Sequence, residues 1–299
     1  RAARIIEAME REGVVSEATL KRFPVVSDAA APLHQVSPGS LSNAELTASG
    51  YSWVTKVLPY MEEDILYDEI RLHSTKFQTP PFDPSTARDD GTHLATVVIP
   101  SLLCPSYTGD AEAAAGQGSE YDDLALGGGA PAITNYMAIV GTHAKPDDTI
   151  EENGVIISRC GANDDCGEKG LKIRDIGDGT AKTIIFCESV EPVYSAWIDG
   201  QATWVVGLEA AGAGAVQDDG YGGASANVLD VNGYSNVALS GAWPGRVARD
   251  RGPSSQHNGL VHHAFADGHA MSVSNDIDPT VYYRLITRSA GDPAVMDDW

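Results

Sequence analysis

The chain has 299 residues, of which 42% are hydrophobic, so it can bury a sizeable core. Its 42 acidic residues outnumber 20 basic ones and give a formal net charge of −22, which argues against nucleic acid as a partner because little would neutralise the phosphates. No apolar stretch reaches the length of about 18 residues expected of a membrane span.

Residues 1–12 have the pattern of an amphipathic helix. Their apolar residues share one helical face: Ala2, Ile5, Ile6 and Met9. The chain opens on Arg1, without an initiator Met, in what looks like the middle of this helix. We therefore expect a preceding segment to have been removed.

Residues 51–72 carry a second helical pattern, which Pro59 interrupts. Proline lacks the backbone N–H that a helix interior needs, so we expect a kink near Leu58 and a second helix after it. Close to the C-terminus, Asp278 and Pro279 are suited to the N-cap and first helical positions. They predict a final helix that runs to Ile286.

Strand patterns replace helical ones in the second half of the chain. The candidate strands are residues 133–140, 154–158, 171–176, 183–190, 204–208, 260–266 and 269–274. Helices followed by strands predict an α+β fold, with an antiparallel sheet and long loop insertions.

Asp267-Gly268 lies between two alternating apolar runs and predicts a hairpin with a two-residue type I′ turn. In that register Ala266 pairs with His269, and His262 pairs with Val273.

Four of the eight histidines lie near this hairpin, at positions 257, 262, 263 and 269. His262 and His263 point to opposite faces of a strand, and His262 and His269 lie about 13 Å apart, so the hairpin alone cannot bind a metal ion. His257 can fold back towards Asp267, as a hydrogen-bond partner or, less favoured, as a ligand.

The four cysteines are divided between a polar loop and apolar runs. Cys160 and Cys166 flank the loop 161–165 and predict a disulfide. Cys104 and Cys187 stand in apolar runs, where a buried thiol and a second disulfide remain equal alternatives. The chain has no Cys-x-x-Cys pair of the kind that zinc sites use. An even cysteine number and an acidic composition favour an exported protein.

Acidic loops make Ca²⁺ a candidate ligand, because calcium binds clustered carboxylate and carbonyl oxygens. Asp175 with Asp178 is the pair we select; the other clusters are 163–165, 218–219, and Asp276 with Asp278. None has EF-hand spacing, and solvated turns are the favoured alternative.

Trp197, Trp204 and Trp243 would suit sugar stacking if exposed, although burial in the core is the favoured expectation. The common hydrolase and nucleotide-binding motifs are absent from the sequence, and we expect no catalytic residue.

The spacing of one histidine and the hairpin turn resembles a known motif. Nine residues separate His257 from Asp267-Gly268, which resembles the His-x9-Asp-Gly motif of a pilin-like family abundant in planctomycete bacteria. That family carries a type IV prepilin leader and an uncharacterised soluble domain. Further segments resemble the family's in the same order: residues 52–67, 99–106, 135–142, 173–188 and 285–291. Gly177 and Ala181-Lys182 depart from the family's pattern.

The resemblance implies a non-enzymatic pilin or pseudopilin-like subunit of an extracellular filament, or of a type IV pilus or type II secretion apparatus. Residues 1–26 would be the remnant of the pilin-type helix with a short following helix, and residues 27–299 a single α+β domain. A preceding hydrophobic helix would anchor the protein in the inner membrane before it assembles with copies of itself or other pilin-like subunits. Related pseudopilins can hold Ca²⁺ in their C-terminal loops.

Two other classes remain as alternatives. One is an extracellular module that binds carbohydrate or another surface ligand, and the other, less favoured, is a secreted hydrolase.

Overall fold

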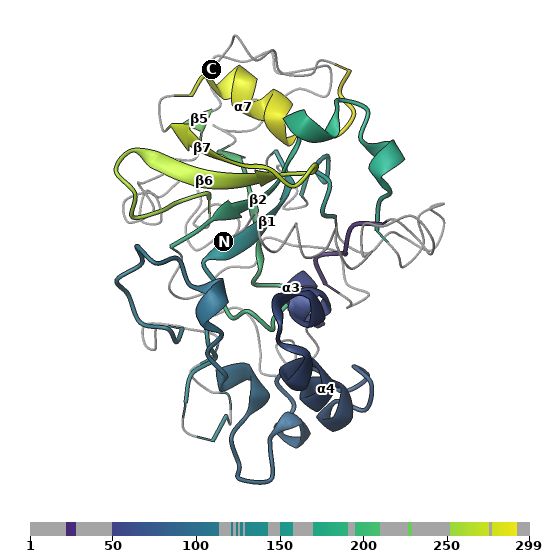
Figure 1. Cartoon of the computed structure of the whole chain (residues 1–299), viewed down its shortest axis with the longest axis vertical. Helices are drawn as coiled ribbons and strands as arrows, with labels where there is room; N and C mark the ends of the chain where they lie inside the picture. The colour runs from purple at the N-terminus through teal and green to yellow at the C-terminus, as the bar shows by residue number, and fades with distance from the viewer. Residues whose placement is uncertain are drawn as a thin grey trace.

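A sheet with strand order β3-β1-β2-β6-β7 is the centre of the described part of the fold (Figure 1). The computed structural model describes residues 22–27, 50–113, 121, 124, 126–127, 129–142, 150–157, 170–190, 195–209, 227–228, 252–274 and 277–291. The predicted helix over residues 1–12 lies outside these ranges.

Helices come first along the described chain, strands follow with two 3₁₀ helices between β1 and β2, and an α-helix comes last. The α-helices are α3 (Trp53–Val57), α4 (Asp64–His73) and α7 (Pro279–Ile286). The 3₁₀ helices are η1 (Leu58–Met61), η2 (Pro84–Thr86), η3 (Leu94–Thr96), η4 (Pro100–Leu102), η6 (Ile173–Asp175) and η7 (Thr180–Lys182). The strands are β1 (Tyr136–Gly141), β2 (Ile184–Glu188), β3 (Trp204–Val206), β4 (Leu208–Glu209), β5 (Asn227–Val228), β6 (Leu260–Phe265) and β7 (Ala270–Ser274).

The central sheet is mixed, so the prediction of an antiparallel sheet is wrong for one strand pair. β1 pairs with β2, β2 with β6, and β6 with β7 in antiparallel orientation, but β1 and β3 are parallel, with Ala138 opposite Trp204. Every residue of β1, β2 and β3 is buried. Such continuous apolar strands are typical of sheets covered on both faces, and their sequence pattern does not encode strand direction. The broader expectation of mixed α and β structure agrees with the fold.

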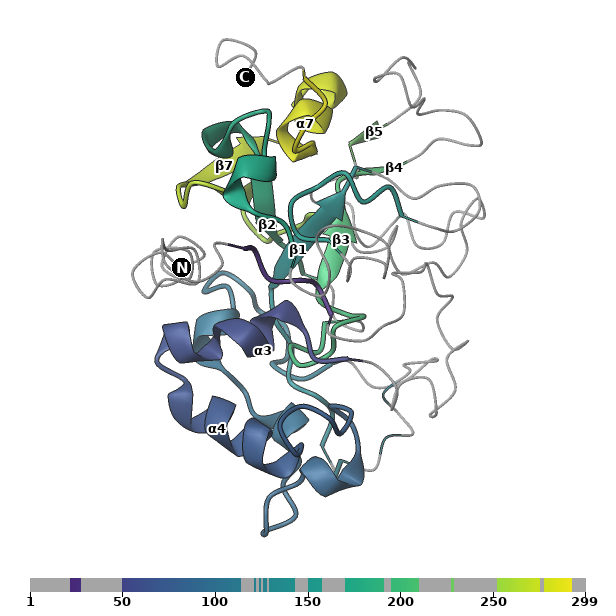
Figure 2. The same ribbon diagram turned by 90° about the vertical axis from the view of Figure 1, so that its right-hand side faces the viewer.

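Alternate residues of the central strands enter two separate apolar clusters. Ala138 and Val140 of β1 pack in a cluster with α3, whereas Met137 and Ile139 pack in a second cluster with α7. Both views place α7 on one side of the sheet and α3 and α4 on the other (Figure 1 and Figure 2). The period-two alternation of a strand therefore directs β1 into two cores at once.

The helical predictions at residues 51–72 and at the C-terminus are confirmed. Ser52 caps α3, η1 contains Pro59, and Glu62 takes a left-handed φ of 65° before α4 begins. At the start of α7, the Asp278 side chain accepts a hydrogen bond from Val281 N at 3.2 Å. Within the described residues no helix is long and apolar enough to span a membrane.

Two strand predictions are wrong. Residues 154–156 form bends, and residues 173–175 form η6, where Lys172 N donates to the Asp175 carboxylate at 2.8 Å. This side-chain acceptor offers the backbone a local partner in place of a neighbouring strand.

The hairpin forms at Asp267-Gly268, but its register differs by one residue from the expected one. His262 pairs with Ser272, and Phe265 N donates to His269 O at 2.9 Å. Gly268 N donates to Phe265 O at 3.0 Å, and Gly268 has a φ of 96°. A three-residue loop of this kind needs a positive φ at the glycine alone, whereas a type I′ turn would also need one at Asp267.

Buried His263 of β6 predicts a specific acid sensitivity. Its ring contacts Val261 O at 3.0 Å and the Tyr282 hydroxyl at 2.8 Å, and burial lowers its pKa from 6.5 to about 4. Between these two pH values the unfolded chain binds the proton more readily, so acidification should lower the free energy of unfolding, by about 3 kcal/mol in total.

Urea unfolding of wild type and His263→Gln across this pH window measures that contribution. We expect a shallower pH dependence in His263→Gln and a wild-type dependence in His73→Gln, which changes the last residue of α4. Equal slopes in wild type and His263→Gln would contradict the assignment.

Candidate functional site

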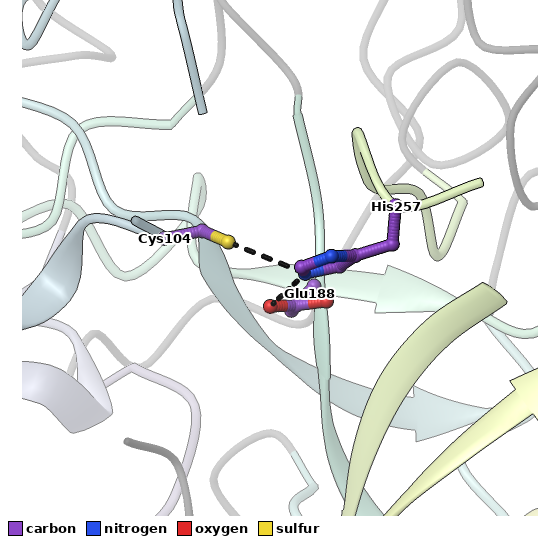
Figure 3. A group of neighbouring side chains, drawn as sticks. All are labelled: Cys104, Glu188 and His257. Atoms are coloured by element: carbon purple, nitrogen blue, oxygen red, sulfur yellow. Dashed lines mark hydrogen bonds and ion pairs between the residues drawn. The ribbon is translucent and has the colours of Figure 1, made fainter. Parts of the chain in front are cut away.

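Three side chains from distant parts of the chain meet beside the sheet: Cys104, Glu188 and His257 (Figure 3). Cys104 Sγ lies 3.6 Å from His257 Nε2, and Glu188 Oε1 lies 3.5 Å from the same nitrogen. One ligand-type atom from each residue lies within 4.8 Å of the other two. Among the described residues, this Cys104–Glu188–His257 cluster is the group whose arrangement suits a metal ion.

Asn135 holds the Cys104 loop against the end of β2. Its side-chain oxygen accepts from Cys104 N at 2.9 Å, and its side-chain nitrogen donates to Ser189 O at 3.1 Å. Its backbone N–H donates to Leu102 O, and its carbonyl accepts from Ser189 N. This fully buried amide thereby fixes the distance between the loop carrying Cys104 and the strand end carrying Glu188.

Glu188 and His257 are each held in place by hydrogen bonds. The second carboxylate oxygen of Glu188 accepts from His262 N at 3.1 Å. His257 N donates to Ser255 Oγ at 3.0 Å, and Ser255 Oγ donates to Leu260 O at 2.6 Å. The His257 segment is also tied to the Cys104 loop, because the Gln256 side chain accepts from Thr108 N at 2.7 Å.

The site is largely shielded from water but retains one open side. Cys104 is 7% exposed and Glu188 4%, whereas the His257 side chain is 26% exposed. Burial raises the pKa of the Cys104 thiol, and the negative charge of Glu188 raises it further. Without a cation beside it, this thiol therefore stays protonated at neutral pH.

The geometry does not match a nucleophile triad. In such a triad the histidine uses one ring nitrogen towards the nucleophile and the other towards the orienting carboxylate. Here Cys104 and Glu188 both face Nε2 of His257 (Figure 3). One nitrogen cannot serve both roles, whereas three ligand atoms that converge can share one cation.

The prediction that His257 pairs with Asp267 is wrong. Asp267 accepts instead from His269, from its backbone N at 3.1 Å and its ring at 2.6 Å. The sequence analysis did not assign Cys104 and Glu188 to a site. Both nevertheless stand in segments that carry the family resemblance, as His257 does, and this shared feature is the signal that could have grouped the three residues.

The structure places the proposed calcium residues among hydrogen-bond donors. Asp178 is buried and accepts from Ala290 N at 2.7 Å and from Gly291 N at 2.9 Å. Asp175 accepts from Lys172 N and pairs with Arg174 at 3.7 Å. These carboxylates therefore stabilise turns, and calcium binding by them stays a prediction.

The remaining candidate site residues are cysteines and tryptophans, and they are either buried or outside the described residues. Cys104 and Cys187 are buried free thiols, so the alternative of a second disulfide between them is wrong. Trp197 and Trp204 are buried, as favoured. Cys160, Cys166 and Trp243 lie outside the described residues, and the disulfide between the first two stays a prediction.

The comparisons with known proteins find one family. A family model named SBP_bac_10, described as a protein of unknown function (DUF1559), matches residues 17–280. No curated protein and no solved structure matches the chain.

Asn135→Ala should destabilise the chain and loosen the Cys104 loop. The variant leaves Cys104 N and Ser189 O without their partner, at about 1–3 kcal/mol for each buried group. Native-state alkylation of Cys104, followed by peptide mass mapping, should be faster than in wild type. Asn153→Ala removes an amide bonded to Thr142 and should leave Cys104 labelling unchanged. Unchanged labelling in Asn135→Ala would contradict the positioning role.

Asp178→Ala should lower stability more than Asp175→Ala. Asp178 is buried and serves two backbone donors, each loss costing about 1–3 kcal/mol, whereas the Asp175 side chain is 37% exposed. Chemical unfolding of both variants measures the difference. Equal losses would show that the contacts of Asp178 contribute little.

Proposed function

The chain belongs to the SBP_bac_10 family of unknown function (DUF1559), and we propose that it is a non-enzymatic, pilin-like structural subunit of an extracellular filament or a related secretion apparatus. In this proposal the predicted helix of residues 1–12 packs on the α+β domain, as in a pilin. A hydrophobic helix ahead of it anchors the protein in the inner membrane before assembly. The assembled subunits lie at the cell surface.

One observation carries the proposal: polar residues of the segments that resemble the pilin-like family contact one another inside the fold. Asn135 joins the segment of Cys104 to the strand end that carries Glu188 and Ser189. His257, which opens the His-x9-Asp-Gly segment, contacts both Cys104 and Glu188. These motif residues therefore have architectural partners, which is expected when a sequence pattern encodes a scaffold.

A second set of contacts supports the same interpretation. Asp178, from the segment 173–188, accepts hydrogen bonds from the backbone of Ala290 and Gly291 in residues 285–291, the closing segment. Arg288 of that closing segment donates to Glu152 O at 2.5 Å and to Gly154 O at 2.7 Å. The closing segment thus joins two distant loops to the end of the domain.

The carbohydrate-binding alternative lacks a supporting observation within the described residues. A sugar platform needs exposed aromatic rings, but Trp53, Trp197 and Trp204 are each at most 1% exposed. The large hydrophobic side chains that are exposed are aliphatic: Ile65, Leu72, Val98 and Leu260.

Electron microscopy of cells that produce the natural full-length protein tests the proposal. An antibody against the domain should label surface filaments. Material sheared from the cell surface should contain the protein in polymeric form. In Ile5→Lys, a charge enters the apolar face predicted for residues 1–12, and filaments should be lost. Glu7→Lys places the same side chain on the opposite face and should leave filaments intact.

The melting temperature of both variants should remain that of wild type, so that loss of filaments reports assembly and not folding. A protein found only as free monomers in the medium would overturn the proposal. Filaments equally abundant in Ile5→Lys would also overturn it.

A further inference from the structure

Two of the three distances between ligand atoms in the Cys104–Glu188–His257 cluster are close to those of a tetrahedral metal site. In a zinc site, bonds of about 2.3 Å to sulfur and about 2.0 Å to nitrogen or oxygen place neighbouring ligand atoms about 3.3–3.6 Å apart. The sulfur-to-nitrogen distance here is 3.6 Å, and the nitrogen-to-oxygen distance is 3.5 Å. The sulfur and the carboxylate oxygen lie within 4.8 Å of each other, so small side-chain adjustments bring all three atoms to bonding distance from one ion.

The charges of the cluster also suit a divalent cation. A Cys104 thiolate and a Glu188 carboxylate carry two negative charges, which balance one divalent ion beside a neutral His257. Both acidic side chains are buried, so the thiolate and the carboxylate can be charged together there only when a cation balances them. Ion binding releases the thiol proton to solvent and forms a sulfur–metal bond in its place.

The donor atoms select the kind of ion. Calcium and magnesium bind oxygen ligands, whereas a set of thiolate, imidazole and carboxylate is typical of zinc. Three protein ligands leave a fourth position for water, and the partly exposed His257 gives the ion a route from solvent.

The ligands are held by a second layer of hydrogen bonds. Asn135 fixes the backbone at Cys104, His262 N holds the outer oxygen of Glu188, and Ser255 holds the backbone at His257. Oriented ligands of this kind increase metal affinity, because less freedom is lost on binding. The set was invisible to motif searching, since its three members come from separate segments with no paired spacing.

We propose that Cys104, Glu188 and His257 form a zinc-binding site that joins the loop after η4, the end of β2 and the segment before β6. This proposal does not rest on filament assembly, and it can be tested on the isolated protein.

Cobalt(II), which adopts the same tetrahedral geometry and has a visible spectrum, is the direct probe. Titration of the metal-free, reduced protein with Co²⁺ should give thiolate-to-cobalt charge-transfer absorption with tetrahedral bands, at one ion per chain. Zn²⁺ should bleach these bands and raise the melting temperature. Mg²⁺ and Ca²⁺ should do neither at equal concentration.

Single substitutions assign the ligands. Cys104→Ser should abolish the charge-transfer band, and His257→Ala and Glu188→Gln should weaken Zn²⁺ binding by more than about 100-fold in calorimetry. Cys187→Ala and His269→Ala remove a second buried thiol and an exposed hairpin histidine, and both should bind as wild type does.

The wild-type spectrum keeps the proposal falsifiable if a ligand variant fails to fold. Absence of a thiolate band in wild type would overturn the site, as would a band that persists in Cys104→Ser. Weak binding at several ions per chain, equal in wild type and His257→Ala, would show adventitious binding to the acidic surface and would also overturn it.

Discussion

The burial of β1 and β2 on both faces is the constraint on which the described structure depends. Alternate side chains of β1 enter one core with α3 and a second core with α7, so neither strand has a face for water. Polar groups at the ends of these strands must then find partners within the protein, because an unpaired buried group is costly. Asn135, just before β1, and Glu188, at the end of β2, satisfy this requirement together with the neighbouring loops.

The same constraint explains why a thiol, a carboxylate and an imidazole share one place. Asn135 binds the Cys104 loop next to the end of β2. The backbone before β6 lies beside the same strand end, because Ser254 N donates to Glu188 O at 2.9 Å. The cluster thus arises where the loop after η4 and the segment before β6 meet the end of β2, a central strand of the sheet. Scaffold and candidate metal site are two aspects of one arrangement, because the contacts that position the ligands also close the domain.

The sequence predicted what local patterns encode. Pro59 marked the break between α3 and α4, and Asp278 with Pro279 marked the start of α7. The parallel pairing of β1 with β3 escaped prediction because fully apolar strands carry no directional signal. The hairpin register shifted by one residue because Asp-Gly suits both a two-residue turn and a three-residue loop. The Cys104–Glu188–His257 cluster was not predicted, because its members meet only through tertiary contacts. Each of the three nevertheless lies in a segment that carries the family resemblance.

The central claim is that three motif segments meet at one cation-sized point. A crystal structure of the zinc-loaded protein, with anomalous diffraction recorded on both sides of the zinc absorption edge, tests it most directly. The account predicts one strong anomalous peak per chain, bonded to Cys104 Sγ, Glu188 Oε1 and His257 Nε2. Separated side chains, or a zinc peak held by other residues, would contradict it.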